Sequence, residues 1–159
     1  MNKKEIKTRI AEIQQELDTL NKQLNELKKT GWEKPSYNKK YYTVSSGFAE
    51  ARDAYGTIDD IRDYGNGNYF TSKELAENIA RYQSLDLRIR RRIAEICEPI
   101  TTTKAYTICY NGNKIEVRHI LRDYGGWRCD TYEHAEQIIE EFKDDLLWYF
   151  TEFKDRMDG

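Results

Sequence analysis

Apolar residues near the start of the chain recur at spacings that alternate between four and three positions, and the positions between them are almost all polar. The stripe runs through residues 3–29 and consists of Ile6, Ile10, Ile13, Leu17, Leu20, Leu24 and Leu27. This heptad pattern predicts a long, coiled-coil-like helix, which Gly31 is placed to end. The stripe is narrow, so it fits packing against one or two other helices. Either it forms a homodimer seam or binds a partner protein, or it packs on the helix near residues 72–97 of the same chain.

The segment after this helix predicts a small antiparallel sheet. Residues 39–54 are rich in aromatic and β-branched residues and predict two strands joined by a turn at Gly47. Residues 55–67 contain three glycines and several aspartates, and we expect an irregular loop there. Tyr69 and Phe70 predict a short third strand.

A second long helix is predicted after this sheet. Thr71 or Ser72 is placed to cap its start, and we expect it to end at Cys97, before Pro99. Its apolar positions recur at helical spacing and are Leu75, Ile79, Tyr82, Leu85, Ile89, Ile93 and Ile96.

The clearest hairpin signal lies in the second half of the chain. Residues 105–121 form two β-rich runs around Asn111-Gly112, a dipeptide typical of tight hairpin turns. Residues 127–129 predict another short strand, and Asp130 or Thr131 is placed to cap the last helix. The apolar face of that helix is predicted to be Ala135, Ile138, Ile139, Phe142, Leu146, Tyr149, Phe150, Phe153 and Met157.

A four-residue sequence occurs twice and indicates an internal duplication. Arg62-Asp63-Tyr64-Gly65 is repeated as Arg122-Asp123-Tyr124-Gly125, 60 positions later, and similar helix starts follow both copies. Each Arg-Asp pair either belongs to a binding site or ties its own loop together. The predicted fold is therefore α+β, with an N-terminal heptad helix in residues 1–30 and two tandem antiparallel-sheet-plus-helix units in residues 32–98 and 99–159.

The composition favours a folded chain without a general attraction to nucleic acid. The 159 residues are 38% hydrophobic and 34% charged, but they include 12 Tyr, 5 Phe and 3 Trp, whereas disordered chains are poor in aromatic residues. The net charge of −2 does not attract DNA, RNA or an acidic membrane. Three widely spaced cysteines, no signal-peptide pattern and no long apolar run predict a protein of the reducing cytosol that does not span a membrane.

The last predicted helix is strongly acidic. From Thr131 to Gly159 the chain has nine Asp or Glu and three Lys or Arg. An exposed acidic face can imitate DNA phosphates or attract a basic partner, and otherwise it is the solvated side of an ordinary amphipathic helix. The residues predicted to contact a protein partner are Glu133, Glu136, Glu140, Glu141, Asp144, Asp145 and Glu152.

Two basic segments indicate an alternative, nucleic-acid-binding function. The residues that would contact phosphates are Arg88, Arg91, Arg92, Lys39 and Lys40. The three arginines can share one helix face, and the lysines lie in residues 32–42, which alternate aromatic and basic side chains as single-strand binders do. The competing interpretations are an arginine surface paired with neighbouring acids and a strand whose aromatic residues enter the core.

Residues 32–80 resemble a broad group of small phage and prophage accessory proteins, mostly of unassigned function. The shared pattern is an entry with Trp32 and Pro35, the Tyr41-Tyr42 strand, a turn at Gly47 and a helix start in residues 68–77. The resemblance extends less closely to the second half of the chain. It implies a phage setting, in which proteins of this size often bind a host or phage protein and some inhibit CRISPR–Cas nucleases.

No residue pattern predicts catalysis, a metal or a cofactor. Cys109, His119 and Cys129 could meet on neighbouring strands, but they lack the close spacing of known zinc sites. The glycines at 65 and 67 lack the strand and helix context of a phosphate-binding loop. We therefore expect a non-enzymatic, phage-type binding protein that inhibits a host defence protein through its acidic last helix. The alternatives are a nucleic-acid-binding accessory protein and a coiled-coil assembly protein.

Overall fold

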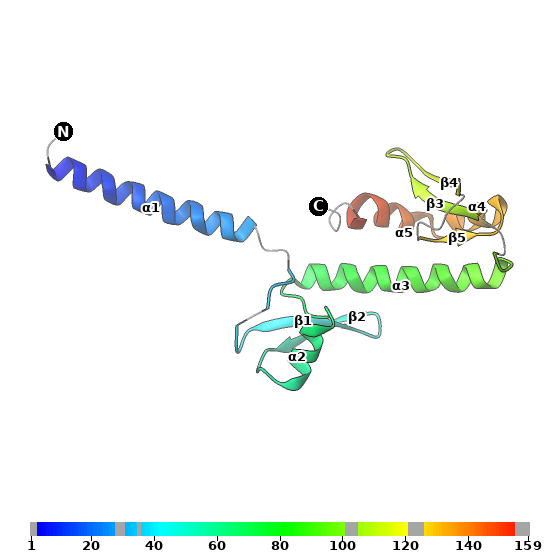
Figure 1. The fold of residues 1–159 in the computed structure, drawn as a ribbon, viewed down its shortest axis with the longest axis horizontal. Coiled ribbons are helices and arrows are strands. Elements are labelled where there is room, and N and C mark those ends of the chain that lie inside the picture. The colour runs from blue at the N-terminus through cyan, green and yellow to red at the C-terminus, as the bar shows by residue number, and fades with distance from the viewer. Residues whose placement is uncertain (1–2, 28–30, 35, 101–104, 121–125, 155–159) are drawn as a thin grey trace. The chain divides into compact units, whose positions relative to one another are not determined.

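The structure is a computed structural model that describes residues 3–27, 31–34, 36–100, 105–120 and 126–154. The α+β class predicted from the sequence is confirmed, with a long N-terminal helix and two small sheets. The helices are α1 (Lys3–Leu27), α2 (Ile58–Gly65), α3 (Lys73–Ile96), α4 (Tyr132–Glu141), α5 (Lys143–Trp148) and the π-helix η1 (Tyr149–Phe153) (Figure 1). The strands are β1 (Lys40–Ser45), β2 (Phe48–Asp53), β3 (Ala105–Tyr110), β4 (Ile115–Ile120) and β5 (Arg128–Cys129).

The chain divides into two compact units. One consists of Met1–Thr43 with Glu50–Leu75, and the other of Val44–Ala49 with Ala76–Gly159. Most of α3 therefore belongs with the second sheet and the C-terminal helices, although it follows the first sheet in sequence. Among the described helices, none is both long and apolar enough to cross a bilayer.

The backbone conformation of the segment that follows α1 requires a glycine at position 31. Gly31 has φ +86°, a left-handed conformation that residues with a Cβ rarely adopt. Its carbonyl oxygen accepts a 2.7 Å hydrogen bond from the Thr71 N–H. A Cβ at Gly31 would lie 2.8 Å from Leu75 Cδ2, which is closer than carbon atoms pack. The glycine thus permits a close approach between this segment and the residues around the start of α3.

The first sheet is the hairpin of β1 and β2, as predicted. Its turn places Ser46 at φ +52° and Gly47 at φ +83°, the two positive angles of a turn that matches the twist of a hairpin. The predicted third strand is reduced to a single bridge, in which Tyr42 and Phe70 exchange backbone hydrogen bonds of 2.7 and 2.9 Å. Trp32 packs edge-on against the Phe70 ring at a centroid distance of 4.7 Å.

Residues 55–67 are not an irregular loop as expected, because most of them form α2. Thr57 caps this helix by accepting a hydrogen bond from the Asp60 N–H, and the Asp60 side chain accepts one from the Thr57 N–H. This reciprocal capping box satisfies two backbone donors that would otherwise have no partner. The glycines and aspartates of this segment are typical of loops, so its sequence favoured a loop although it contains a capping box. Residues 62–65, the first copy of the repeated sequence, end this helix, while the second copy, residues 122–125, lies outside the described residues.

A polar network lies in the core of the first unit. Tyr41 is buried, stacks on Tyr69 at a centroid distance of 3.8 Å and donates a 2.7 Å hydrogen bond to Asp60. Asp63 of the repeated sequence is also buried, and Arg52 donates a 3.1 Å hydrogen bond to it. Both carboxylates thus have partners, and this arrangement fits the interpretation in which the Arg-Asp-Tyr-Gly sequence serves packing.

The second sheet has the strand order β4-β3-β5. The predicted hairpin is confirmed, with Tyr106 opposite His119 and Tyr110 opposite Ile115. Asn111 shapes the turn, since its side-chain oxygen accepts hydrogen bonds of 3.0 Å from the N–H groups of residues 113 and 114. On the other side of β3, Tyr106 lies opposite Cys129 of the short strand β5.

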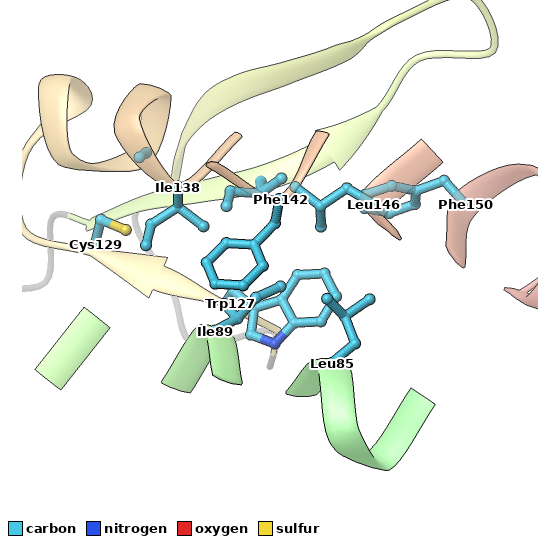
Figure 2. Close-up of a cluster of buried hydrophobic side chains, with 10 residues drawn as sticks. Leu85, Ile89, Trp127, Cys129, Ile138, Phe142, Leu146 and Phe150 are labelled. Atoms are coloured by element: carbon cyan, nitrogen blue, oxygen red, sulfur yellow. The ribbon is translucent and has the colours of Figure 1, made fainter. Parts of the chain in front are cut away.

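The core of the second unit lies between α3, the second sheet and the C-terminal helices. Figure 2 shows the indole ring of Trp127 lying among Leu85 and Ile89 of α3 and Phe142. The indole N–H donates a 2.9 Å hydrogen bond to Asp86 Oδ1 at the edge of this cluster. The other buried members are Ile108, Cys129, Ala135, Ile138, Leu146 and Phe150. The apolar periodicities predicted for α3 and for the last helix therefore supply most of this core.

The last predicted helix is interrupted once. Thr131 caps α4 by accepting a 3.1 Å hydrogen bond from the His134 N–H, which settles the choice between Asp130 and Thr131. Phe142 has φ −113° and ψ +21° and separates α4 from α5, and η1 continues the chain. Because Phe142 and Leu146 still face the core, the interruption preserves the predicted apolar face. Met157 lies outside the described residues.

Candidate protein-binding surfaces

The apolar seam of α1 is exposed to solvent. Ile6, Ile10, Ile13, Leu17 and Leu20 retain between 42% and 60% of their accessible surface. Leu24 and Leu27 complete the predicted seam, but their side chains lie outside the described part of α1. From residue 5 to residue 23 every side chain is exposed, so within the described residues nothing covers this face.

An exposed apolar stripe on a long helix is a candidate docking surface. In proteins, most of the stability of a helix comes from packing of its apolar face against other elements. Apolar surface bordered by polar residues marks sites of protein association. The stripe has the heptad spacing that places its side chains on one line along α1, so a second helix can cover all of them together.

Two of the acidic residues predicted to bind a partner are ion-paired within the chain. Asp145 accepts hydrogen bonds from Arg81 at 3.1 Å and from Arg88 at 2.6 Å. Glu141 accepts one from Arg92 at 2.8 Å. Burial raises the pKa of Asp145, but the hydrogen bonds from the two arginines lower it more, and the net pKa is below its ordinary value. These contacts join α3 to the C-terminal helices.

The other predicted acidic residues remain on the surface of the C-terminal helices. They are all exposed and are Glu133, Glu136, Glu140, Asp144 and Glu152. The acidic surface that is open to a partner is therefore smaller than the sequence indicates.

The predicted basic face of α3 is largely occupied by the same ion pairs. Arg88 and Arg92 of that face form the contacts given above, and Arg90, which is not among the predicted contact residues, pairs with Asp86 at 2.7 Å. Arg91 forms no ion pair with a described residue. The interpretation of these arginines as a surface paired with the acidic last helix fits this geometry, because bound carboxylates compete with phosphate for the guanidinium groups.

Two of the aromatic residues at the first strand pack within the chain, while its two lysines stay exposed. Tyr41 is buried in the core, and Trp32 packs on Phe70. Lys39 and Lys40 are exposed at the start of β1. Stacking of nucleotide bases requires free aromatic faces, and two of the aromatic residues of this segment are used for packing instead.

An acidic groove lies between the outer strand of the second sheet and α4. It has a volume of about 470 Å³ and is lined by Lys114, Ile115, Glu116, Val117, Tyr132, Glu136, Ile139 and Glu140. Three carboxylates against one lysine make the groove acidic, and Ile115, Val117 and Ile139 give it apolar walls. The strand β4 has β3 on one side only within the described sheet. Such an edge can accept an extended segment of another chain.

The structure does not gather the cysteine and histidine residues that the sequence indicated. Cys109 lies opposite Glu116 and His119 lies opposite Tyr106 on the hairpin, whereas Cys129 is on the other side of β3. Instead, Cys97, Asp130 and His134 lie together, with their potential ligand atoms within 4.8 Å of one another. Sequence reasoning missed this group because Cys97 is 33 residues from Asp130, and only the Asp-x-x-x-His spacing at the start of α4 gives a local signal.

Comparisons of the chain with protein-family models, with curated proteins and with solved structures found no match.

Proposed function

We propose that this protein is a non-enzymatic binding protein that self-associates through α1 as a two-stranded coiled coil. The proposal rests on one observation, the exposure of five successive seam residues, each between 42% and 60% exposed. It develops the coiled-coil assembly function expected from the heptads, and it keeps the cytosolic setting indicated by the cysteine content.

A second copy of this chain is the partner that best fits the seam. Knobs-into-holes packing requires a helix with the same heptad spacing. The other long helix, α3, uses Leu85 and Ile89 in the core of the second unit. A second α1 therefore supplies the matching stripe, and the two identical stripes can cover each other along their whole length.

The seam predicts a dimer that dissociates on dilution. Covering the exposed half of an Ile or Leu side chain contributes roughly 1 kcal/mol, so the five described positions on two helices contribute on the order of 10 kcal/mol. Association costs about 4–15 kcal/mol in lost translational and rotational freedom. Because these terms are similar in size, we expect a reversible equilibrium between monomer and dimer.

Light scattering over a range of protein concentrations tests this proposal. The mass of the full chain should rise from monomer to dimer with concentration. Leu17→Lys introduces a charge into the seam and should keep the chain monomeric. Gln15→Lys adds the same charge at an exposed position outside the seam and should leave the dimer unchanged. A monomeric mass at every concentration, or the same dimer in all three proteins, would contradict the proposal.

The acidic groove supports a second candidate function, in which the protein binds a basic segment of another protein. Its three carboxylates and apolar walls fit an extended chain that alternates basic and apolar side chains. The inhibitor of a host defence protein expected from the phage resemblance is one form of this function. Proteins that handle nucleic acid have basic surfaces that such a groove can attract.

A labelled peptide of alternating Lys and Val tests the groove directly. We expect salt-sensitive binding that Glu136→Lys weakens at least tenfold, because the substitution places a positive charge in the groove. Glu133→Lys makes the same change on α4 outside the groove lining and should have a smaller effect. Equal weakening by both substitutions would indicate a general charge effect and would remove this candidate.

We also propose that the two sheet-plus-helix arrangements arose by duplication. Tyr42 pairs with Phe70 as Tyr106 pairs with Cys129, so each hairpin has a third segment on the same side of its first strand. The Ser72 hydroxyl then accepts a hydrogen bond from the N–H three residues later, as Thr131 does. The same order of contacts in both halves supports the duplication indicated by the repeated Arg-Asp-Tyr-Gly sequence.

A further inference from the structure

A thiol, a carboxylate and an imidazole converge beside the start of α4. Cys97 directly follows α3, Asp130 precedes the capping residue of α4, and His134 lies in the first turn of that helix. Their potential ligand atoms lie within 4.8 Å of one another, and His134 Nδ1 is 2.7 Å from Asp130 Oδ1. All three belong to the second unit, so one compact body positions them.

Hydrogen bonds around this group point toward Asp130. The carboxylate accepts from His134, from the Cys97 thiol and, at 3.0 Å, from the Glu98 N–H. Burial raises the pKa of Asp130, but these bonds lower it more, so its net pKa is below the ordinary value. Two of these donors, the Cys97 thiol and the His134 imidazole, can also bind a metal ion once the proton that each donates to Asp130 is removed. A single cation near the positions of these two protons would contact all three side chains.

The Cys97 sulfur is surrounded by donors of its own. It accepts a hydrogen bond from the Asp130 N–H and another from the buried Cys129 thiol. Hydrogen bonds to a coordinating sulfur stabilise a thiolate once a cation is present.

We propose that Cys97, Asp130 and His134 form a binding site for a zinc ion, with the fourth position open to water. Thiolate, imidazole and carboxylate are the ligand types that zinc takes, whereas calcium and magnesium select oxygen ligands. One thiolate, one carboxylate and one neutral imidazole have a total charge that a divalent cation balances. Tetrahedral bonding at the usual zinc distances separates ligand atoms by about 3.3–3.6 Å, so side-chain shifts of about 1 Å complete the site.

The zinc ion would connect the end of α3 to the start of α4. The side chain of His134 is 32% exposed and that of Asp130 is 16% exposed, so the group is open to ions in solution. Binding to the folded chain alone stabilises it by an amount that grows with the logarithm of the free metal concentration once that exceeds Kd. The three residues belong neither to the seam of α1 nor to the lining of the acidic groove, and the site does not depend on either proposed function.

Titration of the reduced, metal-free full chain with Zn²⁺ and with Co²⁺ tests the site. We expect one Zn²⁺ per chain by calorimetry, a higher Tm with Zn²⁺, and a cobalt spectrum with a thiolate charge-transfer band and tetrahedral intensity. Cys97→Ser should abolish the thiolate band and weaken Zn²⁺ binding at least a hundredfold. His134→Gln should weaken binding by a similar factor, and its partly exposed position should leave the fold intact.

The chain offers matched controls for both substitutions. Cys109→Ser and His119→Gln remove the same functional groups from the second sheet, away from the proposed ligands, and should leave Zn²⁺ binding unchanged. Circular dichroism without metal shows whether each variant folds, and His134→Gln decides the outcome if Cys97→Ser does not fold. The proposal is overturned if the wild-type chain binds no Zn²⁺, or if His134→Gln binds it as tightly as the wild type.

Discussion

The hydroxyl group of Tyr41 donates a 2.7 Å hydrogen bond to Asp60 Oδ1 across 19 positions of sequence. The other oxygen of the same carboxylate accepts hydrogen bonds of 2.9 Å from the Tyr55 and Thr57 N–H groups. One side chain therefore holds the first strand, the loop after the hairpin and the start of α2. The stability of this region depends on a contact between a buried phenol and an ionised carboxylate.

Removing the Tyr41 hydroxyl should destabilise the first unit. Tyr41→Phe leaves the carboxylate of Asp60 without its phenolic donor, and we expect a loss of about 2 kcal/mol. Tyr37→Phe removes a hydroxyl from a side chain that is 75% exposed and should change stability by less than about 0.5 kcal/mol. Urea unfolding with hydrogen-exchange readout over residues 39–70 measures both. Equal protection in the two variants would show that this hydrogen bond does not stabilise the unit.

The same contact predicts a loss of stability in acid. The hydrogen bond from Tyr41 is the largest cause that lowers the pKa of Asp60, to about 2. The ionised form is favoured in the folded state, so its contribution is present above the unfolded pKa of about 4. It is lost as the pH falls from about 4 to about 2. Thermal unfolding over this range should show a shallower pH dependence for Asp60→Asn than for the wild type, and an unchanged slope would contradict this.

Gly31 should tolerate alanine less well than Gly47 does. Both have φ near +85°, so alanine costs about 1 kcal/mol of backbone strain at either position. At Gly47 an added Cβ meets no atom within 4 Å, whereas at Gly31 it lies 2.8 Å from Leu75 Cδ2. We expect Gly31→Ala to cost at least about 1 kcal/mol more than Gly47→Ala in urea unfolding. Equal costs would mean that the Leu75 side chain moves aside freely.

Adjacent leucines of α5 should differ sharply in their contribution to stability. Leu146 is fully buried in the second core and Leu147 is 46% exposed. Leu146→Ala removes buried methyl groups and leaves a cavity, and we expect a loss of about 3 kcal/mol. Leu147→Ala makes the same chemical change at the surface and should cost less than about 1 kcal/mol. Thermal or urea unfolding followed by tryptophan fluorescence compares them, and similar losses would contradict the assignment of this core.

The ion pairs of Asp145 should have a small effect that depends on salt. Arg81 and Arg88 are about half exposed, so solvent screens their attraction to the carboxylate. We expect Asp145→Asn to lower stability by about 1 kcal/mol at low salt and by less at 1 M salt. Asp144→Asn removes the same charge from a neighbouring exposed residue and serves as the control. A loss for Asp145→Asn that does not change with salt would point to packing instead of charge.

Local patterns in the sequence were enough to predict the helices and strands whose formation depends on residues close together in the chain. The heptads predicted α1, Asn111-Gly112 predicted the second hairpin, and the apolar periodicity of α3 predicted Leu85 and Ile89 as core residues. Such signals come from backbone geometry and from side chains within a few positions of each other. The helix α2 was missed although its capping box is local, because glycines and aspartates nearby favoured a loop.

Tertiary structure alone decided which charged and reactive side chains meet. The sequence showed an acidic helix and a row of arginines, but only the packing of α3 against the C-terminal helices pairs Asp145 with Arg88. The same packing brings Cys97 to Asp130 and His134 and leaves Cys109 and His119 apart from them. The physical reason is that these contacts join residues dozens of positions apart, whose separation is set by how helices and strands fill the core.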